Sequence, residues 1–399
     1  MEYIKRESFI EQLKNWRDKN VIKVVTGVRR SGKSTLFDLF VEELKSSGVT
    51  DEQIVRLNLE DAENDHLTTY KELYEVVKSQ LVPDKMNYIF IDEVQMIDKF
   101  QKAVNSIYIK KNCDVYITGS NSDMLSSELA TLLSGRYIEI KMMPLSFGEY
   151  SEFVKATDRR QQFAEYLKFG SFPYVSKLEK NDEIVKMYLD GIYNSILIKD
   201  IAKRMGITDI SILDAIAKFL CDNIGNSVSS KKIADNINAS GRKVSVNTVD
   251  SYLRALTESF IFYKCDRFDL KGKMHLKTLG KYYIVDTGFR NMLLGNKGAD
   301  MGRQIENVAY LELLRRGNKV SVGKRYEKEV DFVVENFKGR EYYQVCLNAL
   351  DEETLKRELA PLQAISDNYP KFLLALDDFS KGDYEGIEVV NLIDWLLNS

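Results

Sequence analysis

Residues 21–34 read VIKVVTGVRRSGKS, and this stretch decides the fold. Its first part, VIKVVT, is a short β-branched run that ends at Gly27, which is typical of a buried strand stopping at a turn. After the basic turn, the apolar positions of TLFDLFVEEL (35–44) recur at helical spacing. The stretch therefore predicts a strand, a glycine-rich loop and a helix in direct succession.

The loop GVRRSGKS (27–34) matches the pattern GxxxxGK[ST] at each fixed position. Such a loop brings backbone N–H groups against phosphate oxygens, and the following helix adds its positive N-terminal end. We therefore expect a nucleotide phosphate site in which Lys33 reaches the β- and γ-phosphates and Ser34 holds Mg²⁺. The residues expected to surround the phosphates are Gly27, Val28, Arg29, Arg30, Ser31, Gly32, Lys33, Ser34 and Thr35.

Two acidic residues end the next strongly apolar run, YIFIDEV (88–94). We expect Asp92 to orient Mg²⁺ through its water shell and Glu93 to polarise the attacking water as general base. A solvated pair of acids at a strand end is the alternative interpretation. The complete phosphate loop upstream favours the catalytic one.

Further polar residues follow the next strand-like run, which ends ITGSNS (117–122). Asn121 or Ser120 is the candidate sensor of the γ-phosphate, although both residue types are also ordinary helix caps. Arg136, in LLSGRY (132–137), can stabilise transition-state charge in its own or a neighbouring subunit. It can equally pair with a surface carboxylate.

The first 147 residues alternate between strand and helix patterns. Strands are predicted at 21–26, 54–60, 88–94, 115–120 and 137–145, and helices among them near 67–80 and 121–133. This alternation indicates a parallel sheet, whose ligands sit at the carboxyl ends of its strands. Residues 1–147 are therefore predicted to form an α/β P-loop nucleotide-binding domain.

Beyond this domain the pattern changes. Helical patterns dominate 148–225, which predicts a helical lid or linker. Residues 226–283 show helix, polar turn, helix and paired β-like segments, an order that suits a winged helix-turn-helix. Residues 284–399 are mixed α/β, with a helix at 304–317, strands after it and a closing helix around 351–367.

The phosphate loop, IDEV (91–94), TGSNS (118–122), LLSGR (132–136) and PLSFGEY (144–150) occur in this order, and together they resemble the AAA+ ATPases of bacteria and archaea. FGSFPYV (169–175) is similar to the turn that opens the small helical lid in one branch of that class, with Ser171 where a second glycine is usual. The segments from YNSILIKDI (193–201) to YYQV (342–345) resemble a C-terminal domain of unknown function that accompanies this core. The resemblance implies ATP as the nucleotide, and no guanine-reading NKxD motif is present.

The last 116 residues contain the order of a restriction-endonuclease-like core: Glu306 on a helix, Asp331 at a strand start and Gln344 on the next strand. In an active nuclease of this kind the acids bind Mg²⁺ and a lysine activates water. Here QVC (344–346) stands where an acid and a lysine are needed. Glutamine is a poor Mg²⁺ ligand and a thiol needs deprotonation to act as base, so we do not expect cleavage. The interpretation is a nuclease-derived fold kept for binding or docking.

The predicted winged helix carries positive charge that suits double-stranded DNA. The candidate contacts are Lys231, Lys232, Arg242, Lys243, Asn247 and Arg254, with RFDLKGKMHLKTLGK (267–281) as a basic wing. A charged solvated face or a protein contact is the alternative.

The amino-acid composition excludes several classes of protein. The 399 residues carry 57 basic and 60 acidic side chains, a net charge of −3, which excludes a globally basic nucleic-acid binder. The four cysteines are far apart in the sequence, so four buried thiols in a reducing compartment are expected. The two histidines are too few to build a multi-histidine metal centre. No apolar membrane span or signal-peptide core is visible, and a cytoplasmic protein without a membrane partner is expected.

Two functional hypotheses follow. The favoured one is an ATPase, with ATP and Mg²⁺ as cofactors, whose nucleotide state regulates DNA engagement through the C-terminal modules. The alternative is a nucleotide-dependent switch with slow turnover that binds a protein partner and has no DNA role. The guanidinium of Arg136 can act within one subunit or between subunits, and the second role would require a homo-oligomer.

Overall fold

The computed structural model describes residues 3–122, 133, 135–155, 157–207, 209–272, 274–295, 300–326, 328–377 and 382–398. The chain divides into two compact units, Met1–Met143 with Glu258–Phe260, and Pro144–Thr257 with Ile261–Ser399. Each unit is described by itself below. Most of the predicted helix near 121–133 lies outside the described residues.

Unit 1 is built on a five-stranded sheet in the order β2-β3-β4-β1-β5. Its strands are β1 (Ile22–Thr26), β2 (Ile54–Asn58), β3 (Asn87–Asp92), β4 (Cys113–Gly119) and β5 (Tyr137–Lys141). Every neighbouring pair is parallel, which confirms the predicted α/β sheet. Because β4 lies between β1 and β3, the residues that follow these three strands meet at one edge of the sheet.

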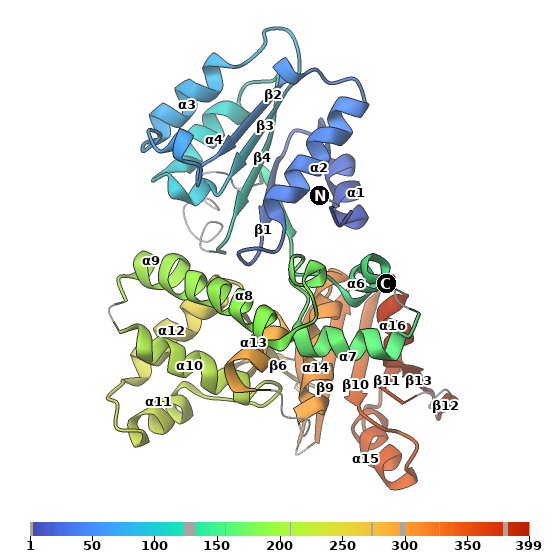
Figure 1. Ribbon diagram of the computed structural model, residues 1–399. Helices are drawn as coiled ribbons and strands as arrows, with labels where there is room; N and C mark the ends of the chain where they lie inside the picture. Colours follow the sequence, from blue (N-terminus) through green and yellow to red (C-terminus); the bar gives the residue numbers. More distant parts are fainter. Residues whose placement is uncertain are drawn as a thin grey trace. The chain divides into compact units, whose positions relative to one another are not determined.

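Helices cover both faces of this sheet (Figure 1). α1 (Glu7–Trp16) and α2 (Lys33–Ser46) pack on one face, and α3 (Tyr70–Ser79) and α4 (Phe100–Tyr108) pack on the other. Neighbouring strand residues alternate between the two cores, with Val25 facing the first pair of helices and Val24 facing the second. Burial on both faces explains why the strands are almost continuously apolar.

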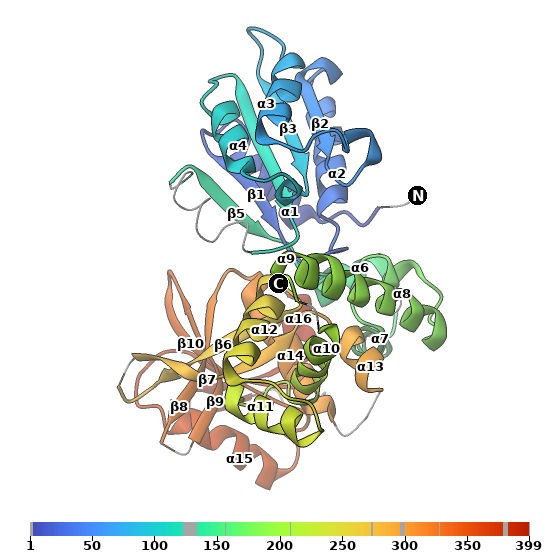
Figure 2. The ribbon, with the colours of Figure 1, turned by 90° about the vertical axis from the view of Figure 1, so that its left-hand side faces the viewer.

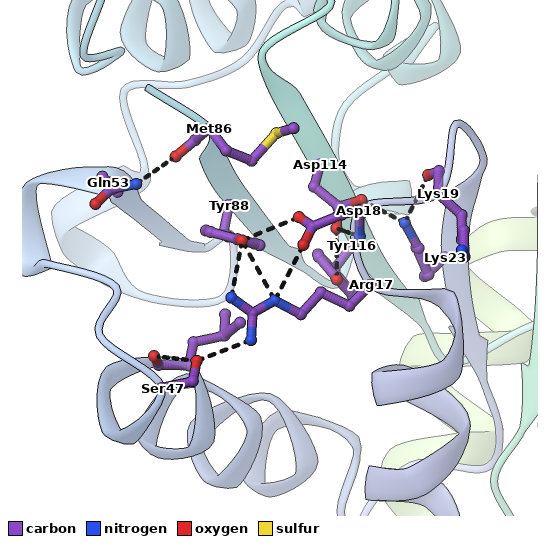
Figure 3. A network of polar contacts seen from close by, with 11 residues as sticks. Arg17, Asp18, Lys19, Lys23, Ser47, Gln53, Met86, Tyr88, Asp114 and Tyr116 are labelled. Atoms are coloured by element: carbon purple, nitrogen blue, oxygen red, sulfur yellow. Dashed lines mark hydrogen bonds and ion pairs between the residues drawn. The ribbon is translucent and has the colours of Figure 1, made fainter. Parts of the chain in front are cut away.

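A polar network fills the amino-terminal edge of the sheet, opposite the phosphate loop (Figure 3). The ammonium of Lys23 on β1 is fully buried and bonds to the carboxylate of Asp114 on β4 and the carbonyl of Lys19. Arg17, just after α1, donates to the hydroxyl of Tyr88 on β3 at 3.2 and 3.3 Å. The network therefore ties α1 to three strands.

Unit 2 begins with helices, as the pattern over 148–225 predicts. They are α6 (Phe147–Val154), α7 (Arg159–Phe169), α8 (Asp182–Ser195), α9 (Lys203–Met205) and α10 (Ile210–Asp222). A π-helix, Ile196–Ala202, joins α8 to α9. Short 3₁₀ turns occur in both units at Asp51–Gln53, Ala62–Asn64, Val94–Met96 and Val175–Lys177.

Two helices and a hairpin follow in the predicted order. They are α11 (Ser230–Ala239), α12 (Val246–Glu258), β6 (Phe262–Asp269) and β7 (Met274–Ile284), the two strands pairing antiparallel. β6 also pairs in parallel with β8, so this hairpin forms one edge of a larger sheet. Figure 2 shows α10, α11 and α12 gathered beside it. The winged-helix assignment stays a prediction.

The larger sheet has the order β12-β13-β11-β10-β9-β8-β6-β7. Its other strands are β8 (Lys319–Arg325), β9 (Lys328–Asn336), β10 (Gly339–Cys346), β11 (Lys371–Ala375), β12 (Gly382–Tyr384) and β13 (Ile387–Asn391). The helices of this part are α13 (Thr287–Leu294), α14 (Met301–Arg315), α15 (Glu352–Gln363) and α16 (Leu392–Leu397).

Two expectations need correction here. The helix predicted to close the chain is α15, but three strands and α16 follow it. Those strands were missed because runs such as KFLLA (371–375) are only five residues long. Cys113 is partly exposed, whereas the other three cysteines are buried as expected. Across the described parts of the chain, none of the helices combines the length and apolar character needed to cross a membrane.

Candidate nucleotide site

The loop between β1 and α2 leaves no room for a side chain at its first glycine. A Cβ at Gly27 would lie 2.0 Å from the carbonyl oxygen of Met142. Gly32, directly before α2, has a φ of +101°, which favours glycine. Both fixed glycines of the motif are therefore required by the backbone itself.

Lys33 is buried at the N-terminus of α2, with 4% of its side chain exposed. Its ammonium donates to the carbonyl oxygens of Gly27 at 3.0 Å and Val28 at 3.3 Å. It also lies 3.5 Å from the Oε1 atom of Glu93. The lysine thus folds back over its own loop and pairs with the acid that sequence reasoning placed opposite it.

Asp92 and Glu93 stand at the carboxyl end of β3, beside the end of β4. The hydroxyl of Thr118 on β4 donates to Asp92 Oδ1 and accepts the N–H of Glu93 at 2.9 Å. Glu93 has a φ of +54°, a turn that ends the strand and directs its chain into the 3₁₀ turn Val94–Met96. The structure therefore brings Lys33, Asp92 and Glu93 together at one edge.

Glu93 is held in its ionised form. Burial alone would raise its pKa, but the nearby Lys33 ammonium, a hydrogen bond from Gln95 and the Arg29 guanidinium outweigh burial and lower it. The Gln95 amide donates to Glu93 Oε2 and, at 3.2 Å, to the hydroxyl of Ser120. Gln95 therefore connects the candidate base with the end of β4.

Arg56 on β2 is a second cation at this edge. Its Nη2 atom donates to the carbonyl of Ser34 at 3.2 Å and to Asp38 at 3.0 Å. The same atom lies 3.7 Å from Asp92 Oδ2. Arg56 therefore stands between Ser34 and Asp92, the two residues expected to hold Mg²⁺.

Several buried polar atoms around the loop have no hydrogen-bond partner, which suits a polar ligand. They are Ser31 Oγ, Arg56 Nη1, Asp92 Oδ2 and Gln95 Oε1. Buried polar atoms normally have hydrogen-bond partners, so these four atoms are available to form hydrogen bonds with a ligand. Asp92, whose Oδ2 atom accepts no hydrogen bond, and the exposed Ser34 are oxygen donors of the kind Mg²⁺ prefers, so these residues fit the metal.

Arg6, just before α1, braces the loop from the outside. It is 4% exposed, and its Nη1 atom donates to the carbonyls of Ser31 at 3.3 Å and Met143 at 2.6 Å. Its guanidinium also lies over the ring of Phe9. The N-terminal segment therefore supports the loop backbone.

The remaining predicted residues of unit 1 divide into two groups. Ser120 and Asn121 are buried at the carboxyl end of β4, beside Glu93 and Gln95. Arg136 lies directly before β5, whose first residue pairs with Ile22 at the start of β1. Its guanidinium bonds to Asn105 at 2.7 Å, at the edge opposite the phosphate loop. This position favours a role of Arg136 toward a neighbouring subunit over a role toward the loop of its own chain.

The other loop residues take up different surroundings. Arg29 forms an ion pair with Glu60 at 2.7 Å, while Arg30 is exposed. Val28 is buried in the loop, and Thr35 lies in the first turn of α2.

In unit 2, the nuclease-like residues form a closed ionic cluster. Lys281 on β7 is 3% exposed, and its ammonium lies 3.0 Å from Glu306, 2.8 Å from Glu329 and 3.7 Å from Asp331. The hydroxyl of Tyr283 donates to Glu306 at 2.7 Å. These contacts correct the expectation that 267–281 is wholly a basic surface, because Lys281 is consumed inside the fold.

Burial and the neighbouring charges in this cluster shift the pKa of the lysine and of one of its acidic partners. Burial would lower the pKa of Lys281, but Glu306, Asp331 and Glu329 outweigh it and raise the pKa. Burial and the neighbouring Glu306 raise the pKa of Asp331 to about 8, although Lys281 opposes them. Within the described residues, no group of three His, Cys, Asp or Glu side chains is arranged to hold a metal ion.

Gln344 does not join the carboxylates as a ligand. Its Oε1 atom accepts the N–H of Asp331 at 3.2 Å, and its amide donates to Glu358 on α15 at 3.2 Å. A side-chain carboxamide used in this way crosslinks β9, β10 and α15. Its geometry supports the expectation of a retained scaffold.

The predicted DNA-contacting residues are exposed on and around α11 and α12. Lys231 and Lys232 lie in the first turn of α11, and Asn247 and Arg254 lie on α12. Arg242 and Lys243 lie between the two helices, with Arg242 bonded to the carbonyl of Ser211 at 3.1 Å. The hydroxyl of Ser230 bonds to Asp250, which joins the helices.

The parallel sheet, the glycine-bounded loop and the acids at the next strand ends define a P-loop nucleotide-binding fold. A family model described as an AAA domain matches residues 19–151, and a domain of unknown function matches residues 160–300. An uncharacterized protein of Haemophilus influenzae is 39% identical over 400 residues, covering 99% of this chain and 98% of that protein. The chain belongs to the AAA+ ATPase family.

Two further comparisons are more distant. An uncharacterized protein of Methanocaldococcus jannaschii is 30% identical over 368 residues, covering 87% of this chain and 79% of that protein. The Walker-type ATPase of Pyrococcus abyssi aligns with a TM-score of 0.52 at 14% identity, covering 73% of this chain and 95% of that one. At this identity, the likeness to the solved structure shows the fold alone.

Sequence reasoning missed the residues that act through tertiary contacts. Arg56 and Gln95 lie outside the motif, and nothing in their spacing links them to Asp92 or Glu93. Lys281 was hidden because it closes a run of charged residues that reads as a solvated wing. Its position directly before the apolar YYIV (282–285), in a strand pattern, was the available signal.

Proposed function

We propose that the chain binds and hydrolyses ATP with Mg²⁺ at the carboxyl edge of the unit 1 sheet. One observation carries the proposal: the ammonium of Lys33 and the carboxylate of Glu93 are buried 3.5 Å apart, among polar atoms that lack partners. Lys33 is satisfied by backbone carbonyls of its own loop, which phosphate oxygens can replace. The choice of adenine as the nucleotide base is inferred from the membership of the chain in the AAA+ ATPase family.

The residues of this edge divide the chemistry between them. Ser34 and Asp92 would hold Mg²⁺, which neutralises phosphate charge when bound. Glu93, kept ionised by Lys33 and Gln95, would polarise the attacking water once Lys33 turns to the phosphates. Asn121 would bond to the γ-phosphate or to the attacking water. The loop from Gly27 to Thr35 would surround the phosphates with backbone N–H groups.

Arg136 is proposed to act only toward a neighbouring copy. Its exposed guanidinium faces away from its own loop, held by Asn105 and lying over the ring of Tyr108. A guanidinium delivered by a second subunit stabilises transition-state charge. This role requires a homo-oligomer.

We further propose that the nucleotide state regulates binding of double-stranded DNA through α11, α12 and the β6–β7 hairpin. The exposed Lys231, Lys232 and Lys243 are suited to phosphates, and Asn247 and Arg254 are suited to a groove. The second candidate, a switch that binds protein, is favoured by the acidic Asp250 in the same surface. In either case the domains at 1–147, 148–225, 226–283 and 284–399 would act as core, lid, winged helix and scaffold.

The test is steady-state ATP hydrolysis with Mg²⁺, with and without duplex DNA. Lys33→Ala and Glu93→Gln should each abolish turnover, while Lys45→Ala, at an exposed lysine of the same helix, should not. DNA-stimulated turnover in the parent supports the first candidate. Turnover that ignores DNA, or tight ATP binding without turnover, supports the protein-binding switch. No ATP binding at all contradicts the proposal.

A further inference from the structure

Arg56 occupies a place that neither the sequence motif nor the family description assigns. It lies in the middle of β2, opposite Phe90 of β3, and its side chain is 27% exposed. Its guanidinium carbon lies 5.3 Å from the centre of the Phe37 ring on α2. Stacking of this kind holds a guanidinium in a defined position.

The held guanidinium meets two carboxylates. Its Nη2 atom bonds to Asp38 at 3.0 Å and lies 3.7 Å from Oδ2 of Asp92. Asp92 is 1% exposed, whereas the Asp38 side chain is 56% exposed. The Nη2 atom also donates to the backbone carbonyl of Ser34 at 3.2 Å, which holds the guanidinium against the first turn of α2.

A buried carboxylate without a cation is costly, and the ion pair with Arg56 supplies one positive charge to Asp92. Mg²⁺ would supply two charges to the same side chain, through its water shell. Because the two cations repel each other, they cannot both be held at Asp92 without loss. Asp38, which already bonds to the same Nη2 atom at 3.0 Å, is the solvated carboxylate that would keep the guanidinium when it leaves Asp92.

We propose that Arg56 is a positioning residue that neutralises Asp92 until Mg²⁺ binds, and that Mg²⁺ must displace it from Asp92 and leave Asp38 as its carboxylate partner. The inference rests on the proposed nucleotide function. It makes Arg56 a regulator of metal affinity: the site stays closed to free Mg²⁺ and accepts the metal together with the nucleotide.

Two substitutions should change the competition between Arg56 and the metal ion for Asp92, and they should do so in opposite directions. Arg56→Gln removes the competing charge and should tighten Mn²⁺ binding about two- to five-fold in the presence of ADP, the range of a partly exposed ion pair. Asp38→Asn leaves the guanidinium to Asp92 alone and should weaken Mn²⁺ binding about two- to three-fold. Arg56→Lys keeps a charge in place and should stay close to the parent.

The experiment measures free Mn²⁺ by electron paramagnetic resonance as the metal is titrated into full-length protein saturated with ADP. A second titration follows a fluorescent ADP analogue in EDTA, where no metal is bound. In EDTA, Arg56→Gln should bind the analogue with an affinity within two-fold of the parent. Thermal unfolding of each variant establishes that it is folded.

Weaker Mn²⁺ binding in Arg56→Gln would overturn the inference, and so would equal changes of Mn²⁺ affinity in Arg56→Gln and Arg56→Lys. Either result would show that Arg56 only supports the structure of the site and does not compete with the metal. Shifts of the same sign in Arg56→Gln and Asp38→Asn would do the same. Failure of the proposed function looks different, since the parent itself would then bind no ADP analogue in either titration.

Discussion

Lys33 and Glu93 neutralise each other across 3.5 Å. Phosphate oxygens are stronger partners for an ammonium than a single carboxylate, so nucleotide binding would take Lys33 away and leave Glu93 facing the γ-phosphate. While the two side chains are paired, Lys33 lowers the pKa of Glu93, so Glu93 is a carboxylate, and therefore a proton acceptor, before the nucleotide binds. The pairing suits a site that is inactive until it is filled.

Glu93→Gln should separate binding from hydrolysis. The amide keeps the shape of the side chain and its contact with Gln95, but it cannot accept a proton. We expect ATP affinity within a few-fold of the parent and turnover reduced about 100-fold or more. Equilibrium binding of a fluorescent ATP analogue and steady-state phosphate release measure the two quantities. Undiminished turnover would show that another group serves as the base.

Asp331 should make the stability of unit 2 depend on pH. Its pKa is raised to about 8 in the folded chain, against about 3.9 for an unperturbed aspartate. Between these values the folded state holds a proton that the unfolded state releases. Stability therefore falls as pH rises from about 4 to about 8. Asp331→Asn removes this proton equilibrium and should flatten the dependence.

The measurement uses urea unfolding at pH 5, 6.5 and 8, followed through Trp395 of α16 in a Trp16→Phe background. The parent midpoint should drop more between pH 5 and pH 8 than that of Asp331→Asn. Parallel curves for the two proteins would mean that the carboxyl group is ionised throughout this range.

The sequence predicted the residues whose roles follow from local spacing. Lys33, Asp92 and Glu93 lie in or directly after strands whose ends meet, so their proximity follows from parallel pairing alone. Arg56 and Lys281 could not be found in this way. Each acts across the fold, and the register that joins it to its partners is a property of the assembled sheet.

Among the elements, the strands of unit 1 depend on the polar network at their amino-terminal edge (Figure 3). Lys23→Met should destabilise unit 1 by about 3–5 kcal/mol, because Asp114 is then left as an uncompensated buried charge. Lys78→Met on α3, whose lysine is half exposed, is the control and should cost less than about 1 kcal/mol.

This prediction is checked by urea unfolding followed through Trp16 of α1 in a Trp395→Phe background. Adding Asp114→Leu to Lys23→Met should recover part of the loss, since an apolar pair can replace a buried ion pair. A loss no larger than that of the control would show that the pair contributes little.

The elements themselves were predicted unevenly. The helices α2 and α3 and the buried strands of unit 1 have strong periodicity, and their ends agree with the sequence pattern within a few residues, whereas α1 and α4 were not predicted. β11 and β13 are five residues each, too short for periodicity to distinguish them from a loop. The joining of β6 to β8 depends on residues far apart in the chain, which no local pattern records.

At the scale of the whole molecule, DNA binding should respond to charge in unit 2. Lys231→Ala with Lys232→Ala removes two exposed cations from the first turn of α11. The affinity for duplex DNA should fall, and the slope of its logarithm against the logarithm of salt concentration should become about two less steep. Lys356→Ala on α15 serves as the control, at a lysine that is 73% exposed.

Fluorescence anisotropy of a labelled duplex at several salt concentrations measures both quantities. Any DNA stimulation of ATP hydrolysis should weaken in parallel in the double variant. Equal binding by the double variant and Lys356→Ala would favour the protein-directed switch instead.

The path of the chain out of unit 1 has a mechanical consequence. Met142 presses its carbonyl oxygen against Gly27, and Arg6 clamps the carbonyl of Met143 to that of Ser31. The following residue, Pro144, is the first of unit 2 and limits the backbone freedom of Met143. Any movement of the loop on ligand binding would therefore act directly on the backbone of Met142 and Met143, the last two residues of unit 1 before Pro144.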